Sequence, residues 1–261
     1  MLNIFKSLFK GREDIYATRW EKGNKNGYSP AYTFDPYHYK MHRMKGGTFQ
    51  NYTNKQYQAL SNEQIIKHLQ GEQLIGLYPL LKDNTSWFIA ADFDKSNWIE
   101  ECKDFIKVCT SKKIPAYLER SRSGKGGHVW IFFEQNYSAF KSRKIFKALL
   151  EEAGVFSQFD KSSSFDRLFP NQDYLSGKGF GNLIALPLNK ITWENGNSCF
   201  INPETLLPIE NQWEFLKTIR KLTITELENL FQSLAIIPDN AVSKTTTTKS
   251  TNGKLNIKLS G

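Results

Sequence analysis

Cysteine is scarce in this sequence, with only Cys102, Cys109 and Cys199 present and no CxxC pair among them. An odd number of isolated thiols excludes a disulfide framework. Three scattered cysteines also exclude a zinc or iron–sulfur site within this chain. We therefore expect a reducing, cytoplasmic setting, and we interpret Cys102 and Cys109 as core residues on the apolar face of a helix.

Long apolar runs are absent as well, so no stretch is predicted to span a bilayer and no membrane partner is expected. The first residues, MLNIFKSLFKGRED, lack the long apolar region and the cleavage site of a signal peptide. Acidic residues are the scarcer charge, with 26 Asp and Glu against 35 Lys and Arg, a net charge of +9. This balance favours nucleic acid as a partner, although a solvated, lysine-rich surface would give the same number.

The chain nevertheless has enough apolar residues to build a core, since 39% of its 261 residues are hydrophobic and 14% are aromatic. We divide it into an N-terminal arm at residues 1–15, a main domain at residues 16–237 and a flexible linker at residues 238–261. The linker assignment rests on AVSKTTTTKSTNGK, a low-complexity stretch rich in Thr, Lys and Ser. A linker of this kind indicates a further domain beyond it.

Helical and strand periodicities alternate through the middle of the chain. We expect strands at residues 74–81, 86–94, 116–120, 128–133 and 182–188, and helices at residues 62–69, 97–113, 142–153, 213–221 and 225–233. Ser61 and Gln64 form a capping box at the start of the first helix, and Gly71 ends it. The order strand, helix, strand, tight loop, strand, helix predicts an α+β fold, close to the topology of the RNA-recognition motif (RRM), with helices on one face of the sheet.

A polar stretch in front of this sheet is rich in both aromatic and basic residues. RWEKGNKNGYSPAYTFDPYHYKMHRMKGG contains Arg19, Trp20, Lys22 and Lys45, which are our candidate nucleic-acid contacts. Basic residues interleaved with aromatic ones suit a surface that binds phosphates and stacks bases. The alternative is a loop-rich subdomain whose rings fill a small core of their own. We expect an additional aromatic and basic α/β subdomain here.

Two carboxylates end the strand FIAADFD. Side chains of a strand alternate between its faces, so Asp92 and Asp94 point the same way. Adjacent carboxylates repel each other, and a divalent cation removes that cost. Mg²⁺ and Mn²⁺ prefer oxygen ligands, and a pair of such ions can clamp an in-line phosphoryl displacement. The alternative is a solvent-facing pair at a strand end.

A short basic glycine loop, SRSGKGGH, joins the next two strands. Its glycines let the backbone approach a ligand and present N–H groups to an anion, and Lys125 adds a point charge. The loop lacks the spacing of a Walker loop, and no helix follows it directly. We predict a triphosphate-binding loop, and a basic hairpin turn is the alternative. The candidate nucleotide-binding residues are Arg120, Arg122, Ser123, Gly124, Lys125, Gly126 and His128.

A third acidic element lies in SFDRLFPNQD. Asp166 follows an apolar residue and could join the first two carboxylates, and Asp173 is a rival for the same role. An isolated Asp is also common as a helix cap or turn residue. Arg167, Asn171 and Lys178 are candidate contacts to a template or nucleotide.

Together and in this order, the three elements resemble the archaeo-eukaryotic primase superfamily, whose members carry a DxD-type motif, an SxH or KGxH-type motif and a final apolar-Asp motif. The sequence is most similar to the bacterial primase-polymerases of TOTE conflict systems and to CRISPR-associated primase-polymerases. The phrases that carry this similarity are TRWEKGNKNGYSPAY, GGTFQNY, YPLLKDNTSWFIAADFD, YLERSRSGKGGHVWIFF and SFDRLFPNQDYLSGKGFGNLIALPL.

The resemblance implies an RRM-like catalytic core and template-directed DNA synthesis, including primer initiation from two free nucleotides. It implies two Mg²⁺ or Mn²⁺ ions on Asp92, Asp94 and Asp166, and a triphosphate on Ser123, Lys125 and His128. The implied partners are a single-stranded DNA template, dNTP or NTP substrates, and a fused or associated helicase or CRISPR-type nucleic-acid module.

Three points stay open at this stage. Tyr78 could pack under the sugar of a nucleotide, although a tyrosine in a strand is usually a core residue. A metal-dependent nuclease also uses clustered carboxylates, but it has no need of a glycine-rich triphosphate loop. A nucleic-acid-binding module that lost its chemistry is the non-enzymatic alternative, and the intact Asp92 and Asp94 argue against it.

Overall fold

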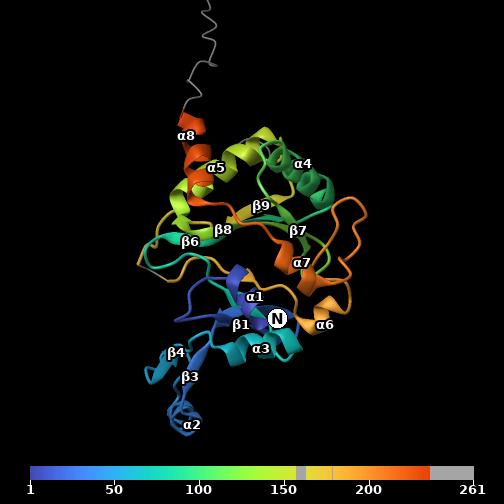
Figure 1. The fold of residues 1–261 in the computed structure, drawn as a ribbon. Helices are drawn as coiled ribbons and strands as arrows, with labels where there is room; N and C mark the ends of the chain where they lie inside the picture. Colours follow the sequence, from blue (N-terminus) through green and yellow to red (C-terminus); the bar gives the residue numbers. More distant parts are fainter. Residues whose placement is uncertain (157–162, 178, 236–261) are drawn as a thin grey trace, which may run out of the picture.

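A five-stranded antiparallel sheet lies at the centre of the computed structural model, which describes residues 1–156, 163–177 and 179–235 (Figure 1). Each strand of this sheet runs antiparallel to its neighbours. In spatial order the strands are β11 (Cys199–Phe200), β7 (Tyr117–Arg120), β8 (Gly127–Ser138), β6 (Thr85–Phe93) and β9 (Phe165–Phe169). The predicted linker at residues 238–261 lies outside the described residues.

Two helices connect these strands in the order that the sequence predicts. Along the chain, β6, α4 (Trp98–Ser111), β7, β8, α5 (Ala139–Glu152) and β9 form a β-α-β-β-α-β unit. Figure 1 shows α4 and α5 on the same face of the sheet, and α8 (Ile224–Ala235) beside α5 on that side. The predicted α+β class is therefore confirmed, and so is the placement of the helices on one face.

The two faces of the central sheet are covered by different parts of the chain. Phe93 of β6 points toward the helices, where its ring lies 6.2 Å from that of Phe105 in α4. On the opposite face, Phe9 packs edge-on against Trp130 and Phe132 of β8, with ring centroids 5.2 and 5.6 Å apart. The side chain of Asp92 shares this second face because strand side chains alternate.

The second face is covered by a smaller, four-stranded sheet and four helices. The strands, in spatial order, are β10 (Ile184–Ala185), β5 (Ile75–Leu77), β1 (Ala17–Lys22) and β2 (Lys25–Pro30). The helices are α1 (Leu2–Leu8), α3 (Asn62–Gln70), α6 (Lys190–Trp193) and α7 (Gln212–Thr218).

In this part of the chain the predicted N-cap and end of the helix are confirmed, and two predicted strands are corrected. Ser61 Oγ accepts the backbone N–H of Gln64 at 3.4 Å, and Gly71 ends α3 with a left-handed backbone. Oε1 of Gln64 accepts from Tyr16 and Gln73, so the second bond of the predicted capping box is not confirmed. The strands expected at 74–81 and 182–188 pair only over β5 and β10. Pro79 and Pro187 explain part of this shortening, since proline has no N–H to donate to a ladder.

The N-terminal segment, predicted to be an arm, contains the helix α1 (Leu2–Leu8), which packs into the core. Phe5, Leu8 and Phe9 recur at helical spacing and belong to the main hydrophobic cluster, with 1%, 2% and 5% of their surface exposed. The predicted boundary at residue 16 stays a prediction. The remaining expectations concern the cysteines and membrane spans. All three cysteines are free and buried, as expected for Cys102 and Cys109. None of the helices in the described ranges is both long and apolar enough to cross a membrane.

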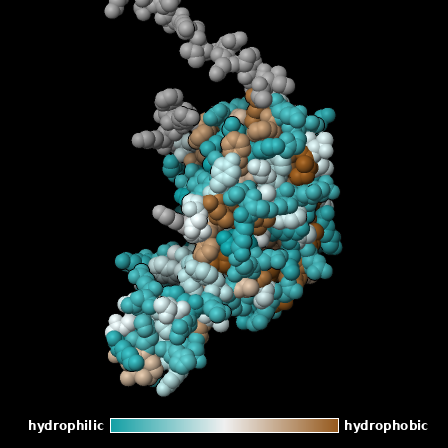
Figure 2. Space-filling view, turned by 90° about the vertical axis from the view of Figure 1, so that its left-hand side faces the viewer, coloured by the Kyte–Doolittle hydropathy of each residue, from teal (hydrophilic) through white to brown (hydrophobic). Residues whose placement is uncertain are grey.

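A lobe of residues 32–57, which we call the α2 lobe, projects from this body (Figures 1 and 2). It consists of β3 (Tyr32–Phe34), α2 (Pro36–Met44) and β4 (Lys55–Tyr57). The ring of Phe49 lies within 5.5 Å of the rings of Tyr32, Phe34 and Tyr39. These aromatic residues therefore fill the lobe's own small core, which was the second of the two interpretations of this stretch.

The contact of Phe9 with the central sheet predicts a large stability cost for its removal. Phe9→Ala should lower the free energy of unfolding by about 3–5 kcal/mol, because it leaves a cavity beside Trp130 and Phe132. Urea unfolding monitored by tryptophan fluorescence measures this, and Leu207→Ala, at a side chain that is 65% exposed, is the control. A loss below about 1 kcal/mol would show that Phe9 is not part of the core.

Candidate active site

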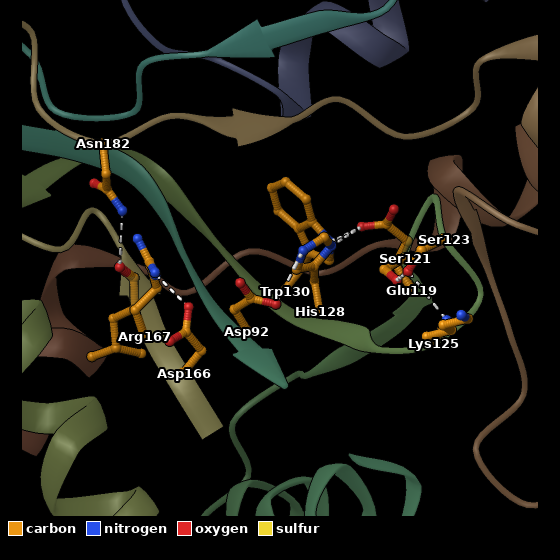
Figure 3. Close-up of polar contacts among 11 residues, drawn as sticks. Asp92, Glu119, Ser121, Ser123, Lys125, His128, Trp130, Asp166, Arg167 and Asn182 are labelled. Atoms are coloured by element: carbon orange, nitrogen blue, oxygen red, sulfur yellow. Dashed lines mark hydrogen bonds and ion pairs between the residues drawn. The ribbon is translucent and has the colours of Figure 1, made fainter. Parts of the chain in front are cut away.

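A row of polar side chains crosses the central sheet at the end of β6. In the strand register, Asp92 lies opposite His128 of β8 on one side and opposite Arg167 of β9 on the other. His128 in turn lies opposite Glu119 of β7. Because directly opposed residues share a face, these side chains lie together on the face away from α4 and α5 (Figure 3).

A β-bulge brings the third carboxylate to this row. The pairing of β6 with β9 passes from Asp92–Arg167 to Phe93–Phe165, so Asp166 has no residue opposite it. An extra residue of this kind bends the strand and redirects its side chain. One carboxylate oxygen from each of Asp92, Asp94 and Asp166 lies within 4.8 Å of the others.

The other candidate for the third carboxylate has a different partner. Asp173 accepts a 2.6 Å hydrogen bond from Nε of Arg143, whose side chain is only 9% exposed. The same guanidinium donates to the backbone oxygen of Pro170 and to Oδ1 of Asn171, at 3.1 and 3.4 Å. Asp173 and Asn171 therefore hold the segment after β9, and the geometry selects Asp166 for the cluster.

Burial and mutual repulsion make the ionised form of the three carboxylates energetically unfavourable when no cation is bound. Burial raises the pKa of Asp92 to about 6; His128 opposes this shift, and the negative charges of Asp94 and Asp166 add to it. Three carboxylates are hard oxygen donors, the ligand type that suits Mg²⁺ and Mn²⁺. The cluster therefore fits a divalent cation in both charge and ligand chemistry.

His128 is held by a residue that the sequence analysis missed. Oε2 of Glu119 lies 2.9 Å from Nδ1 of His128 and accepts the indole N–H of Trp130 at 2.7 Å. On its other side, Nε2 of His128 lies 3.4 Å from Oδ1 of Asp92. Burial alone would lower the pKa of His128, but the carboxylates of Glu119 and Asp92 raise it to about 9. A glutamate inside an apolar strand, opposite a histidine in a hairpin, is the sequence signal for this pair.

The glycine loop lies directly beside the acidic cluster. Residues 121–126 form a tight turn in which the N–H of Ser121 bonds the oxygen of Gly126 at 2.9 Å. A Cβ on Gly126 would lie 2.5 Å from Oδ1 of Asp94, so only glycine permits this approach. The backbone N–H of Lys125 donates to Oγ of Ser123 at 3.2 Å, and the Lys125 side chain is exposed. Gly124 takes a left-handed φ of +72°.

Three other predicted nucleotide contacts have different surroundings. Arg120 donates to the backbone oxygens of Gly196 and Leu206, at 3.2 and 2.7 Å, and so ties down the segment after α6. Tyr78 is 4% exposed and packs in a small cluster, which agrees with the core interpretation of this residue. Arg122 is half-buried in the loop itself.

The predicted nucleic-acid contacts are spread over several elements. Arg19 on β1 pairs with Glu21 at 3.0 Å, and Arg167 pairs with Asp166 at 2.5 Å. Three more of these side chains are exposed: Trp20, Lys22 and Lys45. Lys178 lies outside the part of the chain that the structure describes. Of the members of this group that the structure describes, Arg167 is the one that forms an ion pair with the acidic cluster.

Comparison with known proteins identifies a family. A family model described as the archaeo-eukaryotic primase domain of the TOTE conflict system matches residues 1–230. No curated protein matches the chain. Among solved structures, the polymerase domain of ligase D from Mycobacterium tuberculosis, in complex with DNA, is 12% identical and has a TM-score of 0.39. That match covers 89% of this chain and 83% of the other.

The two candidate third carboxylates predict opposite results in a metal-binding measurement. Asp166→Asn should weaken Mn²⁺ binding by about tenfold or more, because it removes one anionic ligand from the cluster. Asp173→Asn should leave Mn²⁺ affinity unchanged and lower stability, because it breaks the pair with Arg143. Electron paramagnetic resonance titration of free Mn²⁺ measures the affinity. The reverse pattern would assign the site to Asp173.

The pairing of Glu119 with His128 predicts a shift in a proton titration. Glu119→Gln should lower the pKa of His128 from about 9, because burial then acts without the nearby carboxylate. Trp130→Phe, which keeps that carboxylate, is the control. NMR of the histidine ring protons in the metal-free protein measures the pKa, and equal values in wild type and Glu119→Gln would contradict the assignment.

The same shift predicts how stability depends on pH. The folded-state pKa of His128 lies above the ordinary 6.5, so its stabilising contribution is fully present below pH 6.5 and is lost as pH rises through about 9. Glu119→Gln should flatten this part of the stability curve.

Proposed function

The chain belongs to the archaeo-eukaryotic primase domain family of TOTE conflict systems, and from this premise we propose that it is a template-directed DNA primase and polymerase. The observation that carries the proposal is the position of three carboxylates beside a basic glycine loop on one face of the sheet. That arrangement offers a cation site and an anion site in contact, as nucleotidyl transfer from a nucleoside triphosphate requires.

Asp92, Asp94 and Asp166 would hold two Mg²⁺ or Mn²⁺ ions. When bound, such ions activate the attacking 3′-hydroxyl and stabilise the leaving pyrophosphate in an in-line displacement. The protein's own contribution is to fix the three ligands: the sheet register orients Asp92, the glycine contact seats Asp94, and the bulge in β9 turns Asp166 toward them. A preformed ligand set needs no reorganisation when the substrate arrives.

The loop at residues 121–126 would receive the triphosphate. Ser123 and the glycine backbone offer hydrogen-bond donors, and Lys125 offers a mobile positive charge that neutralises phosphate oxygens. His128 is oriented from behind by Glu119, with its Nε2 directed to the acidic side of the site. In the reaction the 3′-oxygen forms a bond to the α-phosphorus, the bond to the β-phosphate oxygen breaks, and pyrophosphate leaves.

The proposed template is single-stranded DNA, and the substrates are dNTPs or NTPs. A net charge of +9 supports a polyanionic partner. Two free nucleotides would be joined in the first step, so that a primer is begun as well as extended. The module would work beside a helicase or another nucleic-acid domain.

The direct test is DNA synthesis on a single-stranded template. Labelled dNTPs and Mn²⁺ or Mg²⁺ are supplied with and without a primer, to wild type and to Asp92→Asn/Asp94→Asn. Wild type should form products under both conditions, and the double variant should lose at least about a hundredfold in rate because its cation ligands are gone. Asp173→Asn, which removes a carboxylate outside the acidic cluster, is the control and should keep the activity.

The other outcomes discriminate between functions. Products only with a primer would leave a polymerase without initiation. Shortening of labelled DNA, without incorporation, would identify a nuclease. No chemistry with DNA binding intact would contradict the proposal and favour a binding module.

A further inference from the structure

The α2 lobe projects from the body of the molecule and is largely exposed. None of the residues of α2 is buried, which is unusual for a helix that is not part of an interface. Figure 1 shows the lobe extending from the body on the side away from α4 and α5, and Figure 2 shows it projecting with a mostly hydrophilic surface. Most side chains of such a protruding helix are accessible to a partner and are not required for packing of a core.

The lobe is nevertheless held firmly at its base. The ring of Tyr57 lies 4.9 Å from that of Phe180, which in turn lies 5.4 Å from the buried ring of Tyr78. The hydroxyl of Tyr16 donates to Oε1 of Gln58 at 3.0 Å, and the N–H of Gln58 donates to the oxygen of Ala31. These contacts connect the lobe to the small sheet and to the segment after β9.

The two sides of α2 differ in what they present. Tyr39 and His42 face inward: the ring of Tyr39 lies 5.2 Å from Tyr52, and Nε2 of His42 lies 2.9 Å from Oδ1 of Asn51. The outward side carries Tyr37 and Met44, which are 67% and 72% exposed. Their spacing of seven residues places them on one stripe of the helix.

The charge of the lobe is mainly positive. Lys40, Arg43, Lys45 and Lys55 are opposed within it by Asp35 alone, and Asp35 is used as the N-cap of α2, accepting the N–H of His38 at 2.8 Å. Among the described residues, no carboxylate forms an ion pair with Lys40, Arg43 or Lys45, and all three side chains are exposed.

A hollow of about 390 Å³ lies along this basic side of the helix. It is lined by Pro36, Tyr39, Lys40, Arg43 and Met44. Cationic tips beside apolar and aromatic surface match the alternation of phosphates and bases along a nucleic-acid strand. A protein partner would need a comparable acidic patch and would gain nothing from this alternation.

We propose that the α2 lobe binds single-stranded nucleic acid, with Lys40, Arg43 and Lys45 on phosphates and the Tyr37 ring stacked on a base. The identity of that strand as the template rests on the proposed function, whereas the binding itself does not. The lobe lies apart from the acidic cluster, so it would act as a second point of contact that increases affinity for longer strands.

The test compares two triple variants of equal charge in the full chain. Lys40→Gln/Arg43→Gln/Lys45→Gln removes the lobe cations. The matched control, Lys107→Gln/Lys113→Gln/Lys144→Gln, removes three exposed charges from the α4 and α5 side of the molecule. Fluorescence anisotropy with labelled oligo-dT, at several salt concentrations, measures Kd for each protein.

The lobe variant should weaken binding by about tenfold or more, and the slope of log Kd against log salt should fall by about 2, since each phosphate contact on a single strand contributes about 0.7. The control should stay within about twofold of wild type. Equal losses in the two variants, or no loss in either, would overturn the proposal. Stronger competition by a blunt duplex than by oligo-dT would overturn the assignment to single strands.

Stacking and catalysis are separated by two further measurements. Tyr37→Ala should weaken oligo-dT binding by at least about fivefold, and Tyr37→Phe, which keeps the ring, should not. Equal affinity in Tyr37→Ala and wild type would contradict the stacking role.

In primer extension the lobe variant should raise the KM for template and leave kcat unchanged. If the lobe variant binds oligo-dT more weakly but the wild-type protein synthesises no DNA, the proposed function is contradicted and the proposed binding site is still supported.

Discussion

Repulsion among three carboxylates at one end of β6 is the constraint on which the rest of the site depends. The side chain of Asp92 is only 13% exposed, and one carboxylate oxygen each of Asp94 and Asp166 lies within 4.8 Å of one of its own. Negative charges so arranged destabilise a fold unless positive charge balances them. His128 and Arg167 supply part of that charge from the neighbouring strands. A divalent cation would supply the remaining positive charge, and its coordination by the three carboxylates would remove their mutual repulsion.

The surrounding fold serves to hold that cluster in place. The helices α4 and α5 cover one face of the central sheet, and Phe9, the residue after α1, packs against β8 on the other. The loop that joins β7 to β8 is pressed against Asp94 through a glycine. Glu119 stands behind His128 in the same cross-strand row. Cation ligands and the proposed triphosphate loop are therefore positioned by a single antiparallel sheet.

Much of this arrangement follows from local sequence rules, and the remainder depends on contacts between distant segments. Strand alternation places Asp92 and Asp94 on one side, and helical periodicity gives α3, α4 and α5. The choice between Asp166 and Asp173 could not be made from sequence, because it depends on a bulge in β9 and on the pairing of Arg143. Glu119 was missed because its partner, His128, is set by the register of β7 and β8. Arg120 was assigned to the nucleotide because its partner in the segment after α6 cannot be read from the sequence. The packing of Phe9 into the core could not be predicted from sequence, because the strand that it contacts lies more than a hundred residues away along the chain.

The most direct test of the account is a crystal structure of the protein with Mn²⁺ and a non-hydrolysable deoxynucleoside triphosphate. Anomalous scattering at the manganese edge locates the ions independently of the protein model. The account predicts manganese peaks within coordination distance of Asp92, Asp94 and Asp166, with the triphosphate against the loop at residues 121–126. Manganese at a different set of ligands, or a triphosphate bound away from this loop, would contradict it.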